Sequence, residues 1–76
     1  MENSEIKRLL WIFSLENSVK FGGKPNVKAI LGKLMSQNPE LRSQIKGIKS
    51  ILDNIVLEIS KLTLQEQKIK LLELKP

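Results

Sequence analysis

An uninterrupted series of large aliphatic residues limits the fold of this chain more than any other feature. Their spacing alternates between four and three residues, which places every member on one face of an α-helix. The series is Leu41, Ile45, Ile48, Leu52, Ile55, Ile59 and Leu62. Such a seam is typical of the core-facing side of a bundle helix, so we expect a helix over residues 39–62. Gly47 is its weak point, and the sequence leaves open whether the helix is continuous or broken near Gly47–Ser50.

The first part of the chain has the pattern of another helix, over about residues 4–21. Asn3 or Ser4 can cap its start by accepting a backbone N–H. Its apolar residues fill two adjoining faces, one with Ile6, Leu9, Leu10, Phe13 and Phe21 and the other with Trp11, Ile12, Leu15 and Val19. This arc is too wide for a helix with a single neighbour. We therefore expect a central core helix; the alternative is that part of the arc meets a partner protein.

Glycine, proline and polar capping residues separate the other helices. Gly22–Gly23 can end the first helix, because glycine adopts the left-handed backbone conformation without steric penalty. Asn26 can cap a second helix over residues 26–37, and Asn38 with Pro39 is expected to cap and start the third. The second helix has one apolar stripe, formed by Val27, Ile30, Leu31, Leu34 and Met35.

A short final helix is expected over residues 64–74. Thr63 and Glu66 have the spacing of a capping box. The residues expected to be buried are Ile69, Leu71, Leu72 and Leu64. No segment has the pattern of a strand, so the prediction is an all-α fold: one domain over residues 1–76, a small bundle of about four helices.

The residue types exclude most site chemistry. The 76 residues include no cysteine and no histidine, so disulfides and the usual zinc ligands are missing. The carboxylates Glu16, Glu40, Asp53 and Glu58 are scattered, and we predict no catalytic residue, no metal site and no cofactor. The glycine turn can offer backbone N–H groups to a phosphate, but it lacks the longer loop of a nucleotide-binding motif. No apolar run has bilayer length and no targeting segment is evident, so we expect a cytoplasmic protein.

Positive charge is concentrated in the middle of the chain. The formal net charge is +5. Residues 20–49 alone carry +6, because seven basic residues stand there against Glu40. These seven are Lys20, Lys24, Lys28, Lys33, Arg42, Lys46 and Lys49. A patch of one sign attracts polyanions, so these side chains are candidates for contacts with RNA phosphates; the alternative is a merely solvated surface.

Several blocks in this order resemble the N-terminal appended domain of archaeal glutamyl-tRNA synthetases. The first blocks are Leu15–Lys24, Asn26, Ala29–Ile30, Gly32–Leu34 and Asn38–Arg42. Later ones are Ile55–Val56, Glu58–Ile59, Leu62–Thr63, Glu66–Gln67, Leu72–Leu74 and Pro76, so nearly the whole chain is covered. The Gly-Lys-x-Asn block also resembles helical tail domains of tRNA-dependent amidotransferases. After the lysine of this block, relatives tend to have alanine, whereas this chain has Pro25 after Lys24. Relatives often have a proline in the middle of the third segment, where this chain has Ser50.

The resemblance implies an accessory role for this chain. No catalytic domain accompanies it, so ATP and magnesium are expected only for the catalytic part of the longer synthetase. The first hypothesis is a domain that assists tRNA binding through phosphate contacts. With one Trp, no Tyr and both Phe residues assigned to the core, base stacking is not indicated. The second hypothesis is a docking module for another synthetase or a scaffold protein, with Trp11 at the interface. The sequence leaves open the oligomeric state and whether the chain is a natural short protein.

Overall fold

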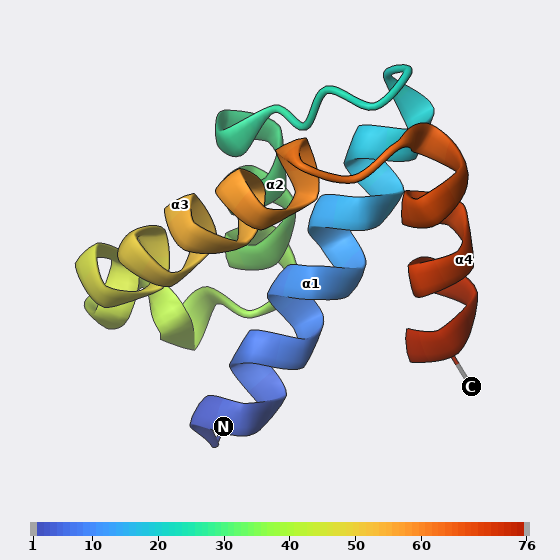
Figure 1. The fold of residues 1–76 in the computed structure, drawn as a ribbon. Coiled ribbons are helices and arrows are strands. Elements are labelled where there is room, and N and C mark those ends of the chain that lie inside the picture. Colours follow the sequence, from blue (N-terminus) through green and yellow to red (C-terminus); the bar gives the residue numbers. More distant parts are fainter. Residues whose placement is uncertain (1, 76) are drawn as a thin grey trace.

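The prediction of an all-α fold is confirmed by a computed structural model, which describes residues 2–75. Pro76, where the family resemblance closes, lies outside the described residues. Four α-helices and one 3-10 helix follow one another, and no strand occurs between residues 2 and 75. In chain order they are α1 (Asn3–Lys20), α2 (Val27–Gln37), η1 (Pro39–Gln44, the 3-10 helix), α3 (Ile45–Ser60) and α4 (Leu64–Leu74) (Figure 1).

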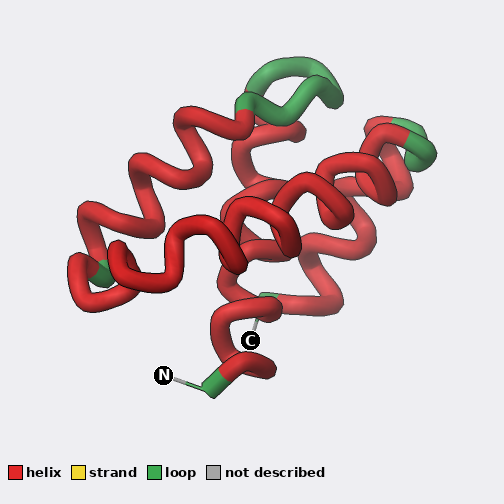
Figure 2. The backbone as a smooth tube through the Cα atoms, turned by 90° about the vertical axis from the view of Figure 1, so that its left-hand side faces the viewer, coloured by secondary structure: helices red, strands yellow, loops and turns green. Residues whose placement is uncertain are grey.

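Helix α1 is the centre of the molecule. It packs against α2, α3 and α4, which surround it on different sides (Figures 1 and 2). Its buried residues point in all directions around the helix axis and are Ile6, Leu10, Ile12, Phe13, Ser14, Leu15 and Ser18. The expectation of a central core helix is therefore confirmed. The predicted cap is wrong, because Glu2 precedes the first turn and no side chain accepts a bond there.

The end of α1 is fixed by two glycines with positive φ. Gly22 has φ +71° and Gly23 has φ +99°. The N–H of Gly22 donates to the carbonyl of Val19 (3.3 Å), and that of Gly23 donates to the carbonyl of Ser18 (2.7 Å). This bond pair is a Schellman motif, which satisfies carbonyls left free at a helix end. The predicted glycine stop is confirmed, but these N–H groups are occupied and do not form a phosphate cradle.

Two asparagines link the turn to the start of α2. The Asn26 side chain accepts the N–H of Ala29 (3.1 Å), so the predicted cap is confirmed. The Asn17 side chain in turn accepts the N–H of Asn26 (2.7 Å). Since Asn17 belongs to α1, this bond fixes α2 relative to the helix before it.

The third segment differs from the single helix expected over residues 39–62. Its first turns form η1, and the α-helix begins at Ile45 and ends at Ser60. Gly47 and Ser50 lie inside α3, which is continuous there. A 3-10 helix repeats every three residues, so the seam loses its register where η1 meets α3. Leu41 is buried, but Ile45 is 43% exposed, contrary to the prediction.

The sequence predicts that Asn38 caps the third segment, and this prediction is wrong, because its side chain accepts no bond there. Its side-chain amide donates instead to the carbonyl of Leu34 (3.2 Å), which closes the end of α2. Pro39 occupies the first turn of η1, as expected.

Helix α4 begins with the predicted capping box but buries different residues. The Thr63 hydroxyl accepts the N–H of Glu66 (3.1 Å), and the Glu66 carboxylate accepts the N–H of Thr63 (2.9 Å). Ile69 is 48% and Leu72 is 76% exposed, so their predicted burial is wrong. Leu64 is 37% exposed, Leu71 is half-buried, and the residue of α4 that is fully buried is Gln67.

Gln67 is buried because three other groups satisfy its amide. The Ser18 hydroxyl of α1 donates to Gln67 Oε1 (2.5 Å). Gln67 Nε2 donates to the carbonyls of Leu62 (3.2 Å) and Ile59 (3.4 Å). These hydrogen bonds offset the cost of removing the Gln67 amide from water. They also connect α4 to α1 and to the end of α3.

The apolar core lies between α1, α2, η1 and α3. Its members are Ile6, Leu10, Ile12, Phe13, Leu15, Ile30, Leu34, Met35, Leu41, Ile48, Leu52, Ile55 and Ile59. From α4, Leu71 and Leu74 pack against its edge. None of the helices described in residues 2–75 is long and apolar enough to cross a bilayer.

Candidate nucleic-acid interface

All seven basic side chains of residues 20–49 belong to exposed residues, but they do not form one patch. Three stand around the Gly22–Gly23 turn, and we call Lys20, Lys24 and Lys28 the turn group. Three stand on η1 and the first turns of α3, and we call Arg42, Lys46 and Lys49 the α3 group. The turn group lies at the start of α2, whereas Arg42 follows the end of that helix. The 11 residues of α2, a helix about 16 Å long, stand between the turn group and Arg42.

The turn group surrounds the positive end of a helix. Lys20 ends α1, Lys24 follows the two glycines, and Lys28 lies in the first turn of α2. Lys20 lines a small cavity together with Ala29, so the end of α1 and the start of α2 lie close together. The first turn of α2 contains no acidic residue. The dipole of α2 therefore adds to the positive potential near Lys28, whereas the C-terminal end of α1, where Lys20 stands, contributes partial negative charge.

Phe21 lies within the turn group and is exposed, contrary to its assignment to the core. It follows the last helical residue of α1, and 55% of its surface is accessible to solvent. The Lys20 ammonium stands 5.8 Å from the centre of its ring. Phe13, in contrast, is buried as expected.

The α3 group follows the exposed side of the third segment. Lys46 and Lys49 are three residues apart on α3 and therefore on neighbouring positions of its surface. Arg42 lies on η1, which packs against both α2 and α3. Lys46 and Lys49 thus lie beside the buried seam of α3, whereas Arg42 stands on η1, before the point where the seam loses its register.

Lys33 is set apart from both groups by its neighbours. Its ammonium lies 3.8 Å from Glu16 Oε1 and 4.7 Å from the centre of the Phe13 ring. Glu16 also binds Lys75, at 2.7 Å. This carboxylate on α1 therefore joins α2 to the residue that follows α4, and Lys33 contributes less free positive charge than the other six.

The remaining six basic residues of this segment have no ionic partner within the part of the chain that the structure describes. The ion pairs there are Lys33 with Glu16, Lys75 with Glu16 and Lys61 with Glu58. The turn group and the α3 group are therefore exposed and uncompensated, which is the electrostatic arrangement that favours polyanions.

Trp11, predicted at a partner interface, is half-buried on α1. The Lys70 ammonium of α4 lies 4.6 Å from its ring, a distance typical of a cation–π contact. Trp11 also lines a cavity of about 320 Å³, with Lys7, Ile51, Asn54, Ile55 and Glu58.

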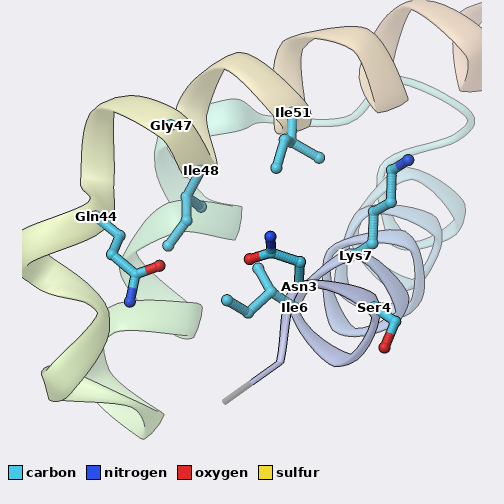
Figure 3. Close-up of a pocket in the computed structure, with 8 residues that line it drawn as sticks. All are labelled: Asn3, Ser4, Ile6, Lys7, Gln44, Gly47, Ile48 and Ile51. Atoms are coloured by element: carbon cyan, nitrogen blue, oxygen red, sulfur yellow. The ribbon is translucent and has the colours of Figure 1, made fainter.

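A second cavity, of about 630 Å³, lies between the first turns of α1 and α3 (Figure 3). Its lining residues are Asn3, Ser4, Ile6, Lys7, Gln44, Gly47, Ile48 and Ile51. It contains no acid–base pair, since Lys7 is its one ionisable side chain. Over residues 2–75, no cluster of three potential metal ligands occurs. The smaller cavity, beside Trp11, has one lysine, Lys7, and one carboxylate, Glu58, in its lining.

Comparison with curated proteins finds relatives along nearly the whole chain. A glutamate–tRNA ligase of Methanococcus maripaludis (strain C5) is 45% identical over 71 residues, which cover 93% of this chain and 13% of the relative. The same ligase of Pyrococcus abyssi is 43% identical over 72 residues, 95% of this chain and 13% of the relative. That of Pyrobaculum aerophilum is 38% identical over 63 residues, 83% of this chain and 11% of the relative. The chain is homologous to one small segment of archaeal glutamate–tRNA ligases.

This homology confirms the family resemblance drawn from the sequence blocks. The chain spans only 13% of the Methanococcus maripaludis ligase, so the match is to a small segment of a much longer protein. No family model matches the chain, and no solved structure matches it.

The sequence pattern locates the exposed basic residues of the candidate interface but does not reveal two features beside them. It does not reveal the exposure of Phe21, although the position directly before Gly22–Gly23 indicates a residue beyond the last regular turn of the helix. Nor does it reveal the pairing of Lys33 with Glu16, for which the sequence gives no local signal because the two residues lie on different helices.

Proposed function

We propose that this chain is a non-catalytic accessory domain that assists tRNA binding in a glutamate–tRNA ligase, by contacts with RNA phosphates. One observation carries the proposal: six of the seven basic residues in segment 20–49 are exposed and have no ionic partner among residues 2–75. Homology to a ligase segment supports tRNA as the polyanion. By the family resemblance, the domain is appended at the N-terminus of the longer enzyme, whose catalytic part would bind ATP and magnesium.

The mechanism is electrostatic. Lysine ammonium groups on the turn group replace cations condensed on the RNA, and the released cations drive binding. Such contacts position the RNA without reading its sequence. Affinity must therefore fall steeply with salt concentration.

The proposal is tested by fluorescence anisotropy with tRNA for glutamate over a series of salt concentrations. The variant is Lys24→Gln with Lys28→Gln, and the matched control is Lys7→Gln with Lys68→Gln, which removes the same charge from two exposed lysines outside segment 20–49 that also have no ionic partner among residues 2–75. We expect the first variant to weaken binding several-fold and to lower the slope of log affinity against log salt by about one per lost contact. The control is expected to bind nearly as the parent does.

Two results contradict this proposal. Absence of tRNA binding by the parent chain at low salt rejects the function altogether. Equal weakening by the two variants rejects the turn group as its location, because net charge alone then explains the affinity.

A protein-docking module is the second candidate, and a specific feature favours it. The two cavities beside α1 share Lys7 and Ile51 and so form one groove between α1 and α3, with Trp11 at one end. Apolar residues Ile6, Ile48 and Ile55 line this groove. Another synthetase or a scaffold protein is the partner expected for such a module.

A further inference from the structure

An exposed aromatic ring in the middle of a basic cluster is the feature that the proposed function leaves unexplained. Phe21 is 55% exposed and is flanked by Lys20 and, across the two glycines, by Lys24. An exposed phenylalanine costs free energy, since apolar surface is better removed from water. A phosphate-binding surface alone has no use for such a ring.

We propose that Phe21 stacks on an unpaired nucleobase of the RNA that the turn group holds. This inference rests on the proposed function and adds the chemical class of the site: an RNA segment with a base free of Watson–Crick pairing. Aromatic side chains surrounded by positive charge are the usual platform for single-stranded nucleic acid, because the ring takes the base while the cations take the adjoining phosphates.

The backbone that carries the ring is fixed before any ligand arrives. The N–H of Phe21 donates to the carbonyls of Asn17 (3.1 Å) and Ser18 (3.1 Å), and the Schellman motif holds the next two residues. The bond from the N–H of Asn26 to Asn17 closes the turn from its far side. A base that stacks here therefore orders little of the backbone, and this preorganisation lowers the entropic cost of binding.

The neighbouring lysines are placed to complete the site. The Lys20 ammonium is 5.8 Å from the ring centre, so a base on the ring brings its own phosphates near this positive charge. Phenylalanine has no hydrogen-bonding group in its side chain, so it does not distinguish one base from another. The site should accept any unpaired base and exclude bases that are stacked inside a duplex.

The test compares two RNAs, a single strand of about ten nucleotides and the same strand annealed to its complement. Anisotropy titrations use the parent chain, Phe21→Ala, Phe21→Trp and the control Leu72→Ala, which removes another exposed apolar side chain far from the turn. We expect Phe21→Ala to weaken single-strand binding at least about fivefold and duplex binding by less than about twofold. Phe21→Trp should keep or increase the affinity, and Leu72→Ala should change neither titration.

A direct measurement accompanies the affinities. Addition of the single strand should shift the ring-proton NMR signals of Phe21, which a stacked base shields, and should leave those of the buried Phe13 in place. The circular dichroism spectrum of each variant establishes that it is folded. If Phe21→Ala is unfolded, Phe21→Leu takes its place, because leucine keeps the apolar bulk but has no ring to stack.

The outcomes separate this inference from the proposed function. If the parent chain binds neither these two RNAs nor tRNA at low salt, both are wrong. If it binds and the Lys24→Gln, Lys28→Gln variant weakens binding, but Phe21→Ala does not, the function stands and the stacking site is rejected. Equal weakening of single-strand and duplex binding by Phe21→Ala also rejects the stacking site.

Discussion

The Glu66 carboxylate couples the stability of α4 to pH. The backbone N–H and the hydroxyl of Thr63 both contact it, and these bonds lower the pKa of the Glu66 carboxyl from its ordinary value of 4.5. Because the pKa is lower in the folded chain than in the unfolded chain, the stabilisation is complete above the unfolded value. It is lost as pH falls through the folded value.

We expect the difference in unfolding free energy between the parent chain and Glu66→Gln to shrink as pH falls from about 6 to about 3. Glutamine can still accept the N–H of Thr63 but does not titrate, which isolates the charge. Urea titrations followed by circular dichroism measure the difference, and Glu73→Gln on the same helix is the control. A difference that stays constant over this range contradicts the prediction.

Single residues also show what hydrophobicity predicts and what it misses. Ile69 and Leu72 were expected in the core because they are aliphatic, yet they are exposed, whereas Gln67 is buried. The reason is not local: the partners of the Gln67 amide are Ser18, 49 residues earlier in the chain, and two carbonyls before α4. No periodicity within residues 64–74 contains that information.

At the scale of elements, the boundaries that depend on short-range bonds were predictable. Asn26 caps α2, Thr63 with Glu66 opens α4, and Gly22 ends α1, and each of these motifs is complete within a few residues. The 3-10 geometry of η1 was not predicted, since Leu41 and the seam that follows suit an α-helix equally well. The contacts of η1 with α2 and α3 exist only in the folded chain.

The interior of α2 leaves room for a stabilising substitution. A Cβ atom at Gly32 meets no atom within 4 Å, and its backbone is helical. We expect Gly32→Ala to stabilise the chain by about 1 kcal/mol, because alanine has the higher helix propensity. For a chain of this size, that corresponds to a melting temperature about 4–8 °C higher, measured by thermal denaturation.

Gly22→Ala is the matched counterpart. It adds the same methyl group in equally open space, but at φ +71°. We expect it to lower the stability by about 1–2 kcal/mol, because L-residues are strained there. A lower melting temperature for Gly32→Ala, or no difference between the two variants, contradicts this account.

At the scale of the whole molecule, α4 is attached less extensively than the other helices. It packs mainly against α1, and the apolar side chains Ile69 and Leu72 on its outer surface have no cover. We expect backbone amides of α4 to exchange with solvent through openings of lower free energy than those in the middle of α1. Hydrogen exchange followed by NMR measures this, with α3 as the reference, and equal protection of α1 and α4 contradicts it.

The candidate site was predictable in its charge but not in its arrangement. The net charge of +6 over residues 20–49 is a property of the sequence. Its division into the turn group and the α3 group follows from the length and direction of α2. The ionic contact of Lys33 and the exposure of Phe21 depend on how the helices pack, which the sequence pattern does not give.

The end of α4 lies near the start of α1, and this arrangement has a practical consequence. The Arg8 guanidinium donates to the carbonyl of Leu74 (2.9 Å), so α4 ends beside the first half of α1. Both ends of the described chain therefore lie on one side of the molecule, and the Gly22–Gly23 turn lies on the other (Figures 1 and 2). The 18 residues of α1 extend for about 27 Å between them. A tether to a sensor surface at either end should thus leave Phe21 and its lysines facing the solution.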